Sequence, residues 1–402
     1  LPSLRSVQPR PPAETILREQ RTNMPADDYR DLFPVTREWS YLNHAAVAPL
    51  SLPAQQRFVE WSQDYVQQGA VREAAWYGEI ETVRRQSADL INAVPEEIAF
   101  LKNTSEGLSL VAEGLDFNPG DSIVIVSGEF PSNVYPWLQK ESHGIDVRQV
   151  PPRERGRVLL SDLEAAIDET TRLLSISFVQ YASGFRSDVA AIGRMCRERN
   201  VLFCLDAIQG LGVFPIDVRE MQIDFLSADG HKWLLSPEGA AIFYCRRELL
   251  DHLRPTTLGW RSVADTTDFS KIDLTFPDTA TRFECGTMNV PGIVALGASL
   301  RLFADVGIDK INQLIRRNTD SLVARLEDCG AEVFSPREED CWSGIVSFEI
   351  PGHSPRKIKK HCINHNVVIS HRDGRVRASP HFYNNDEDLN ALIDALQTAP
   401  RE

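Results

Sequence analysis

A single lysine, Lys232, stands where an amine could act as a nucleophile. It lies in the stretch FLSADGHKWLLSPEG, after an apolar run and small residues, and a second apolar run follows it. Apolar neighbours withhold water from the charged amine and lower its pKa, which favours an amine that forms a Schiff base. A lysine at a strand end is more often a solvated side chain, so this segment alone only nominates Lys232.

The second candidate is Asp206, which ends the apolar run VLFCLD and precedes AIQG. Ligands of open α/β sheets bind at the carboxyl ends of the parallel strands. An aspartate in such a place commonly starts a turn. A carboxylate at this depth is also what keeps the pyridine nitrogen of a pyridoxal cofactor protonated, so that the ring can accept electrons. Lys232 and Asp206 together therefore indicate pyridoxal chemistry.

An anion site is indicated by the stretch NTSEG, residues 103–107, directly before the helix-like LSLVAEGL. Hydroxyls and free backbone N–H groups at a helix N-terminus attract an anion, and the helix dipole adds to this attraction. An ordinary helix cap is the alternative interpretation. Thr104 and Ser105 are the candidate ligands.

Short apolar runs alternate with helix-like patterns in the middle of the chain, which predicts βαβ units and a mainly parallel sheet. The sequence thus favours the α/β class. We expect strands at residues 122–126, 173–179, 201–205 and 240–245, with helices beginning at a capping box of Ser161 and Glu164 and at the cap Asp188.

The pattern changes after residue 300, where a long helix is expected near 308–326 and a strand at 344–350. A closing helix has Leu389, Leu392, Ile393 and Leu396 on one face. We therefore predict an N-terminal arm (1–50), a large α/β/α domain (51–300) and a small α+β domain (301–402).

Composition narrows the class of partners. The chain has 402 residues and a formal net charge of -14, which would repel nucleic-acid phosphates. No apolar run has the length of a membrane span. The seven cysteines form no CxxC pair and lie mostly in apolar runs, which predicts reduced thiols in the cytoplasm. The basic run RKIKKH is expected to be the solvated face of a helix.

Six motifs occur in a specific order: NTSEG, GEFPSNVYPW, LDAIQG, GHKW, FECGTMN and RVRAS. In this order the chain resembles the class V aminotransferase group of fold-type I pyridoxal-5′-phosphate enzymes. Its relatives include cysteine desulfurases, selenocysteine lyases, isopenicillin N epimerase-like proteins and kynureninases. The likeness runs from about Tyr41 to the C-terminal helix. It implies a pyridoxal-5′-phosphate cofactor, an amino-acid substrate and a homodimer with shared active sites.

The resemblance also implies a role for each matching position. Lys232 would carry the cofactor as a Schiff base and move protons at Cα, and Asp206 would pair with the pyridine nitrogen. Arg377 would bind the substrate α-carboxylate, a task that suits a bidentate guanidinium. The other expected contacts are Gln209 to the ring 3′-oxygen, Phe130 over the ring face, Thr104, Ser105 and His231 to the phosphate, Thr287 to the phosphate in the neighbouring subunit, and Asn43 to the substrate.

Three departures from the family pattern affect the expected reaction. Phe130 stands where desulfurases carry a histidine, and Asp229 stands where many relatives have serine. The desulfurases' mobile loop, with the cysteine that forms a persulfide, should precede Arg377, yet SHRDGRVRAS is short and has no cysteine. Cys362 lies in a helix-like stretch instead. A persulfide mechanism is therefore disfavoured.

Several reactions stay open. A C–S lyase, an epimerase or an aminotransferase fits the motifs, with a cysteine desulfurase or selenocysteine lyase as the alternative. A fold that binds cofactor without turnover is a further rival, but Lys232, Asp206 and Arg377 together argue against it. His361 and His365 have the spacing of a metal pair, but no third ligand is in view, so no metal site is expected.

Overall fold

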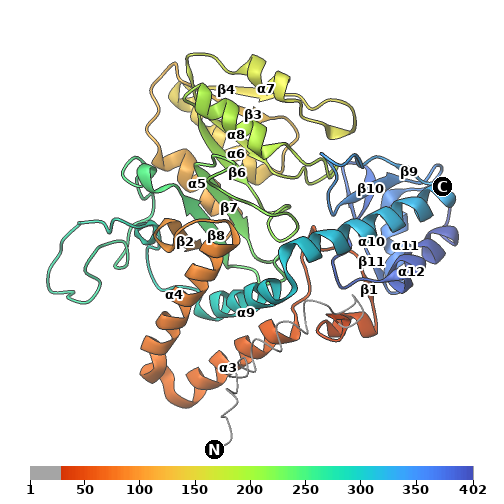
Figure 1. Cartoon of the computed structure of the whole chain (residues 1–402), viewed down its shortest axis with the longest axis horizontal. Helices are drawn as coiled ribbons and strands as arrows, with labels where there is room; N and C mark the ends of the chain where they lie inside the picture. The colour runs from red at the N-terminus through yellow and green to blue at the C-terminus, as the bar shows by residue number, and fades with distance from the viewer. Residues whose placement is uncertain (1–28, 402) are drawn as a thin grey trace, which may run out of the picture.

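The computed structural model describes residues 29–401, and its centre is a seven-stranded sheet in the order β2-β8-β7-β6-β5-β3-β4 (Figure 1). Every neighbouring pair from β4 to β7 is parallel, and β8 runs antiparallel to both β7 and β2. The mainly parallel sheet is confirmed. The strands are β2 (Ile98–Leu101), β3 (Ser122–Val126), β4 (Asp146–Val150), β5 (Thr171–Ser177), β6 (Leu202–Asp206), β7 (Phe225–Asp229) and β8 (Ala241–Cys245).

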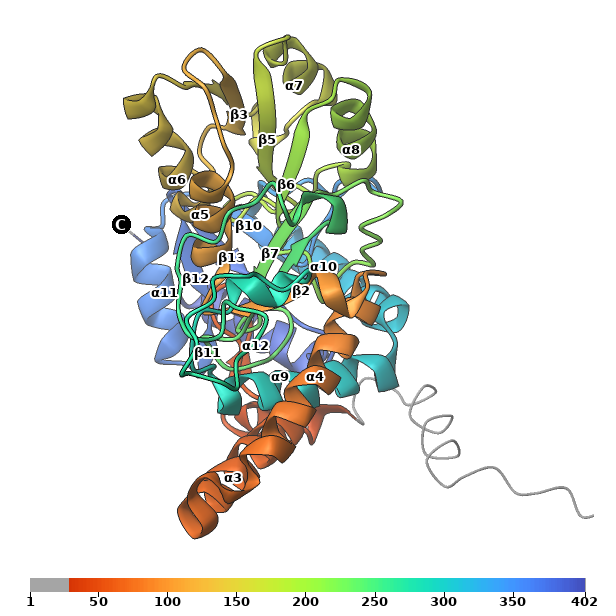
Figure 2. The ribbon, with the colours of Figure 1, turned by 90° about the vertical axis from the view of Figure 1, so that its left-hand side faces the viewer.

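Helices cover both faces of this sheet, which makes three layers (Figure 2). Side chains alternate along a strand, so β3 serves two cores. Val124 belongs to the core that includes Ile192 of α8, whereas Ile123 belongs to the core that includes Leu108 of α5. The expected α/β/α architecture is confirmed. The helices over the sheet are α5 (Thr104–Gly114), α6 (Tyr135–Leu138), α7 (Leu160–Ala166) and α8 (Val189–Glu198).

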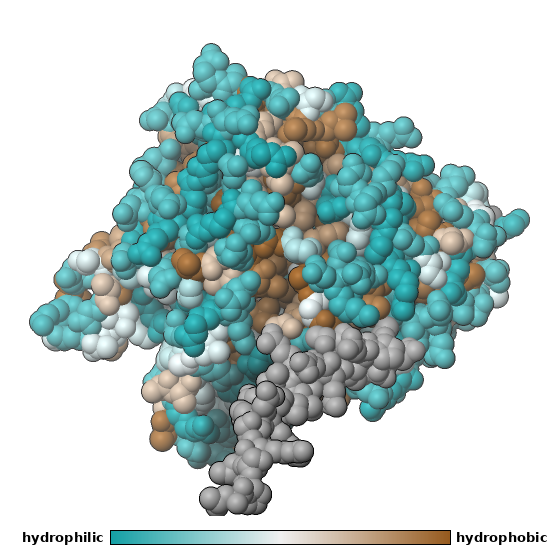
Figure 3. Space-filling view, in the orientation of Figure 1, coloured by the Kyte–Doolittle hydropathy of each residue, from teal (hydrophilic) through white to brown (hydrophobic). Residues whose placement is uncertain are grey.

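Two helices near the N-terminus form a hairpin that projects from the body (Figure 2): α3 (Leu52–Gln68) and α4 (Glu73–Leu90). Both pack against α9 (Val290–Val306), most of whose side chains are buried. The surface in Figure 3 is largely hydrophilic, with a hydrophobic band near its middle. No single helix within residues 29–401 is long and apolar enough to cross a membrane; only α9 and α10 (Ile308–Asp328) together pass by length and composition, and they meet at 83°.

The C-terminal part builds a third core around a four-stranded antiparallel sheet, β12-β13-β10-β9. The short strand β1 (Ser40–Tyr41) pairs with β11 (Val367–Val368) in a separate two-stranded sheet, so the N-terminal part of the described chain lies beside the C-terminal unit. The elements are α10 (Ile308–Asp328), β9 (Glu332–Val333), β10 (Val346–Glu349), α11 (Pro355–Ile363), β12 (Ser370–Arg372), β13 (Arg375–Ala378) and α12 (Asp386–Gln397).

Most expected elements are found within a few residues of their predicted bounds, but one capping prediction is wrong. Asp188 does cap α8, where its side chain accepts from Ala191 N. Ser161, by contrast, lies inside α7, which begins at Leu160 without a side-chain cap. A hydroxyl already inside the first turn is not placed to accept that turn's free N–H groups. The two boundaries between the three predicted parts stay predictions, and residues 1–28 of the arm lie outside the described residues.

Candidate active site

A pocket of about 270 Å³ lies where β6 and β7 end and α5 begins. The carboxyl ends of parallel strands and the N-terminus of a helix therefore meet at one place, as the strand order requires. The pocket brings together eight of the residues singled out from the sequence: Thr104, Ser105, Phe130, Asp206, Gln209, His231, Lys232 and Arg377.

Lys232 and Asp206 are the two titratable side chains at the centre of this pocket. Both are buried, at 9% and 3% exposure, and the Lys232 Nζ lies 5.5 Å from the centre of the Phe130 ring. Burial lowers the pKa of Lys232, as do the charges of Arg377 and Arg372, while Asp206 opposes the shift. Burial also raises the pKa of Asp206, and the nearby Glu129 adds to this. The amine is therefore more easily neutral, and more nucleophilic, than an ordinary lysine.

The anion site at the start of α5 is held by close packing. Asn103 caps the helix by accepting from Glu106 N at 2.9 Å. At Gly107 a side chain would have its Cβ only 2.3 Å from the Ser227 Oγ, so glycine lets α5 lie directly on β7. Thr104 Oγ1 accepts from Asp229 N at 2.9 Å, which joins the helix start to the strand end. The N-terminus of α5 thus opens into the pocket beside Lys232.

Asp229 has a structural partner that the sequence pattern did not reveal. Its Oδ2 lies 2.8 Å from Nδ1 of His231, and its other oxygen is buried without a hydrogen-bond partner. This carboxylate therefore lies within ion-pair distance of the imidazole edge. Aspartate at position 229, where many relatives have serine, therefore places a carboxylate beside His231, a candidate phosphate ligand.

Arg377 is held almost completely buried, with one part of its guanidinium left free. Nε donates to Ser370 Oγ at 3.1 Å and Nη1 donates to Tyr181 O at 2.6 Å. Nη2 is buried without a hydrogen-bond partner. Burial lowers the pKa of Arg377 to about 9, so the side chain stays cationic at neutral pH. A second arginine, Arg372, also lines the pocket and was not singled out from the sequence.

Gln209 has much of its amide engaged by the protein. Its Nε2 donates to Ala45 O at 2.9 Å and its Oε1 accepts from Trp233 Nε1 at 2.8 Å. The amide is thereby oriented, with one N–H of Nε2 left for another acceptor. Its contact with a ring oxygen stays a prediction.

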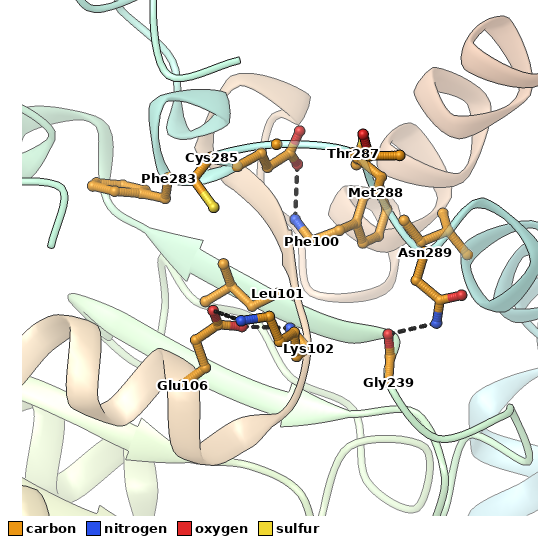
Figure 4. Close-up of a pocket in the computed structure, with 13 residues that line it drawn as sticks. Phe100, Leu101, Lys102, Glu106, Gly239, Phe283, Cys285, Thr287, Met288 and Asn289 are labelled. Atoms are coloured by element: carbon orange, nitrogen blue, oxygen red, sulfur yellow. Dashed lines mark hydrogen bonds and ion pairs between the residues drawn. The ribbon is translucent and has the colours of Figure 1, made fainter. Parts of the chain in front are cut away.

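Two predicted site residues do not line the pocket. Asn43 is half-buried on the N-terminal segment, and its Oδ1 has no partner. Thr287 lines a separate hollow with Cys285, Met288 and Asn289 (Figure 4). Asn289 anchors this segment by donating to Gly239 O at 2.8 Å. The single chain therefore leaves Thr287 outside its own pocket, and the contact with a neighbouring subunit stays a prediction.

The seven cysteines are all free thiols, and none lines the pocket. Cys362 is completely buried in α11, and burial raises its pKa to about 12. Cys341 is likewise raised to about 12 by burial and by Glu338. Thiols in this state are neither ionised nor mobile at neutral pH.

The pocket residues fit a pyridoxal phosphate cofactor. They offer an amine of lowered pKa, a buried carboxylate at a strand end, an aromatic ring, an anion site at a helix N-terminus and a guanidinium with an unpartnered N–H group. A family model for class-V aminotransferases matches residues 40–392. The chain belongs to the class-V aminotransferase family.

Several similar proteins are named for an enzymatic activity. A probable cysteine desulfurase of Methanothermobacter thermautotrophicus is 33% identical over 399 residues, which cover 93% of this chain and 98% of that protein. The solved apo cysteine desulfurase of Thermococcus onnurineus has a TM-score of 0.84 at 28% identity, over 92% of this chain and 96% of its own. A solved cystine C–S lyase, at 23% identity and a TM-score of 0.84 over 91% of this chain and 99% of its own, shares the fold.

These comparisons establish the class of enzyme. The class-V aminotransferase is a pyridoxal-5′-phosphate enzyme of the fold-type I architecture. Its reaction is of the C–S lyase or aminotransferase type, on an amino-acid substrate. The motif order that first suggested this family is confirmed, and so is the cofactor.

Proposed function

We propose that this enzyme is a C–S lyase that removes the sulfur group of a cysteine-type amino acid by β-elimination. The observation that carries the proposal is the absence of every one of the seven thiols from the lining of the pocket. Transfer of sulfur to the enzyme needs a thiolate within reach of the substrate sulfur. Elimination needs only a base at Cα and a leaving group at Cβ.

The roles of the pocket residues follow from their chemistry. The unpartnered Nη2 of Arg377 binds the substrate α-carboxylate and so orients the Cα–H bond. Lys232 forms the covalent link to the cofactor and, once released, accepts the Cα proton at its neutral Nζ. When bound, pyridoxal phosphate withdraws electrons from Cα through its protonated ring, which Asp206 maintains. Thr104, Ser105 and His231 hold the phosphate and Phe130 covers the ring.

Product analysis separates elimination from sulfur transfer. With cysteine or cystine we expect pyruvate and ammonia in equal amounts, because the sulfur leaves with the electrons of the Cβ–S bond and the remaining three-carbon fragment hydrolyses in water. Alanine should be a minor product. The measurement is quantification of pyruvate, ammonia, alanine and sulfide after incubation with each substrate.

Two cysteine variants sharpen this test. Cys362→Ser and Cys285→Ser should leave the pyruvate yield per cofactor unchanged. Alanine as the main product, lost in either variant, would return the enzyme to the cysteine desulfurases, the activity named for its relatives. A keto acid formed together with pyridoxamine phosphate would instead indicate an aminotransferase.

The proposed working unit is a homodimer with shared sites. Thr287 lies outside its own chain's pocket, and the adjacent segment exposes the apolar side chains of Trp260 (42%), Phe269 (68%) and Ile272 (97%). That segment packs on the Thr287 region, since Arg261 N donates to Cys285 O at 3.4 Å. An apolar surface of this kind suits a second copy of the chain.

Complementation tests the shared site. Thr287→Ala should weaken cofactor retention by about 1 to 3 kcal/mol, the cost of leaving a charged acceptor one donor short. A heterodimer of a Lys232→Ala chain and a Thr287→Ala chain should hold one intact site and one doubly damaged site. Cofactor content of heterodimers isolated with two affinity tags measures this. Two singly damaged sites, one without Lys232 and one without Thr287, would show that Thr287 acts within its own chain.

A further inference from the structure

A second buried carboxylate, Glu129, lies behind Asp206 and was not singled out from the sequence. It follows β3, directly before Phe130, and is 4% exposed. Its Oε1 accepts from Ser177 N and Gln180 Nε2, both at 2.8 Å, and its Oε2 accepts from Asn133 Nδ2 at 3.1 Å and from the Ser177 hydroxyl. No arginine or lysine among residues 29–401 pairs with it. Burying a carboxylate without a neighbouring cation destabilises the folded state, so its presence at this position indicates a functional role.

The donors around Glu129 are fixed in orientation. The Asn133 Oδ1 accepts from Trp137 Nε1 at 3.1 Å and from Ser175 Oγ at 2.6 Å, so the amide cannot reverse and must keep its Nδ2 toward Glu129. Three of the four groups that contact the carboxylate are N–H groups, which can only donate a hydrogen bond to it. The site is therefore built for an acceptor.

Ser177 joins Glu129 to Asp206. The two residues Ser177 and Asp206 are paired across β5 and β6. The Ser177 Oγ donates to Glu129 and lies 3.4 Å from the Asp206 Oδ2. One hydroxyl proton thus stands between two buried carboxyl groups. If Glu129 carries a proton, Ser177 Oγ is the only contact that can accept it, and the hydroxyl then turns its own proton to Asp206.

We propose that Glu129 is a positioning residue for the ring-nitrogen site and acts through Ser177 to set the orientation and the charge of Asp206. The inference rests on the proposed role of Asp206. Lys232 is the cation that faces Asp206, and when its amine is neutral the two carboxyl groups share one proton, because two like charges this close do not both ionise. A bound cofactor with an unprotonated ring nitrogen would take this proton, and both carboxylates would then be ionised beside one cation. The ring nitrogen therefore keeps its proton to a higher pH than Asp206 alone would allow.

Ring-labelled cofactor tests this directly. Each protein is loaded with pyridoxal phosphate carrying ¹⁵N in the ring, and the ¹⁵N chemical shift is followed against pH. In Glu129→Gln the ring nitrogen should lose its proton at least about one pH unit lower than in the wild type, since a charge within a few ångströms shifts a pKa by about 1 to 3. Ser177→Ala should shift the titration in the same direction. Gln keeps the shape and the contacts with Ser177 N and Gln180 while removing the charge.

Glu97→Gln is the matched control. Glu97 is also completely buried and accepts from Val94 N at 3.2 Å and Arg247 N at 3.0 Å, and unlike Glu129 it is paired with an arginine, Arg219. It precedes β2, at the end of the sheet opposite to the pocket. Its variant should titrate like the wild type.

Asp206→Asn separates the proposed role of Glu129 from the proposed role of Asp206. If this variant moves the ring-nitrogen titration and Glu129→Gln does not, the role of Glu129 falls while that of Asp206 stands. If neither moves it, Asp206 does not face the ring nitrogen and the proposed assignment falls. The cofactor-free proteins give a second readout that needs no loading. The infrared C=O stretch of the carboxyl group that holds the shared proton should vanish in both Glu129→Gln and Asp206→Asn. Its survival in either variant would show that the two carboxyl groups do not share a proton.

Discussion

Replacing Lys232 by alanine is expected to abolish covalent attachment of the cofactor and to lower turnover by at least about a thousandfold. A positioned general base alone contributes about 10² to 10⁴ in rate, and this lysine also forms the covalent link. No other lysine among residues 29–401 lines the pocket. The fold should survive, since the Lys232 amine forms no ion pair within 4 Å and alanine relieves a buried charge.

Borohydride reduction of the loaded protein, followed by peptide mapping, measures this outcome. The wild type should give one adduct at Lys232 and the variant none. Lys140→Ala is the control, because Lys140 is also buried, at 7% exposure, but does not line the pocket. Its Nζ lies 2.9 Å from Glu113 Oε2. It should keep both adduct and turnover. An adduct at any other lysine of the wild type contradicts the assignment.

The sequence predicted the parts of the site that lie at the ends of continuous motifs. Asp206 could be found because the apolar run before it marks a buried strand, and β6 ends there. Thr104 could be found because NTSEG precedes an apolar helix, and Asn103 is indeed the cap. These signals are local in the chain, so periodicity and capping chemistry are enough to read them.

Glu129 and Ser177 were missed for a different reason. A glutamate in a turn between strand and helix is normally exposed, and nothing in GEFPSN predicts that Ser177 and Gln180 will surround it. Only the pairing order of the sheet brings the two segments together. Ser177 did carry a usable signal, since it lies in the last part of the predicted strand 173–179 and the carboxyl ends of neighbouring parallel strands share one edge. Arg372 was likewise visible in SHRDGRVRAS but had no local pattern to mark it.

The contact of Thr287 with a neighbouring subunit could not be derived from the pattern of a single chain. Its motif, FECGTMN, resembles that of the family, but within the chain the residue lies in another hollow from Lys232. A contact between chains leaves no trace in the periodicity of either. The same holds for the leaving group of the substrate, because the walls of the pocket come from segments as distant in sequence as Ala46 and Arg372.

Asp206→Ala is expected to lower turnover by at least about a hundredfold while leaving the cofactor covalently bound. The carboxylate keeps the ring nitrogen protonated and so stabilises charge that develops only when a bond at Cα breaks, and loss of one such electrostatic group costs about 10² to 10³ in rate. Attachment depends instead on the Lys232 amine. Loss of Asp206 also removes the interaction that raises the pKa of Lys232, so the amine should be neutral at a lower pH than in the wild type.

The measurement is turnover per bound cofactor, beside the borohydride adduct. Asp224→Ala is the matched control: Asp224 is buried at 3%, accepts from Phe203 N at 2.9 Å, and lies at the opposite end of the same pair of strands. Its loss should cost stability without changing turnover per bound cofactor. Asp224 Oδ1 lies 3.1 Å from Arg246 Nη1, whereas no arginine or lysine within residues 29–401 forms an ion pair with Asp206, so Asp206→Ala should not share that loss of stability. Near wild-type turnover in Asp206→Ala would mean that another residue faces the ring nitrogen.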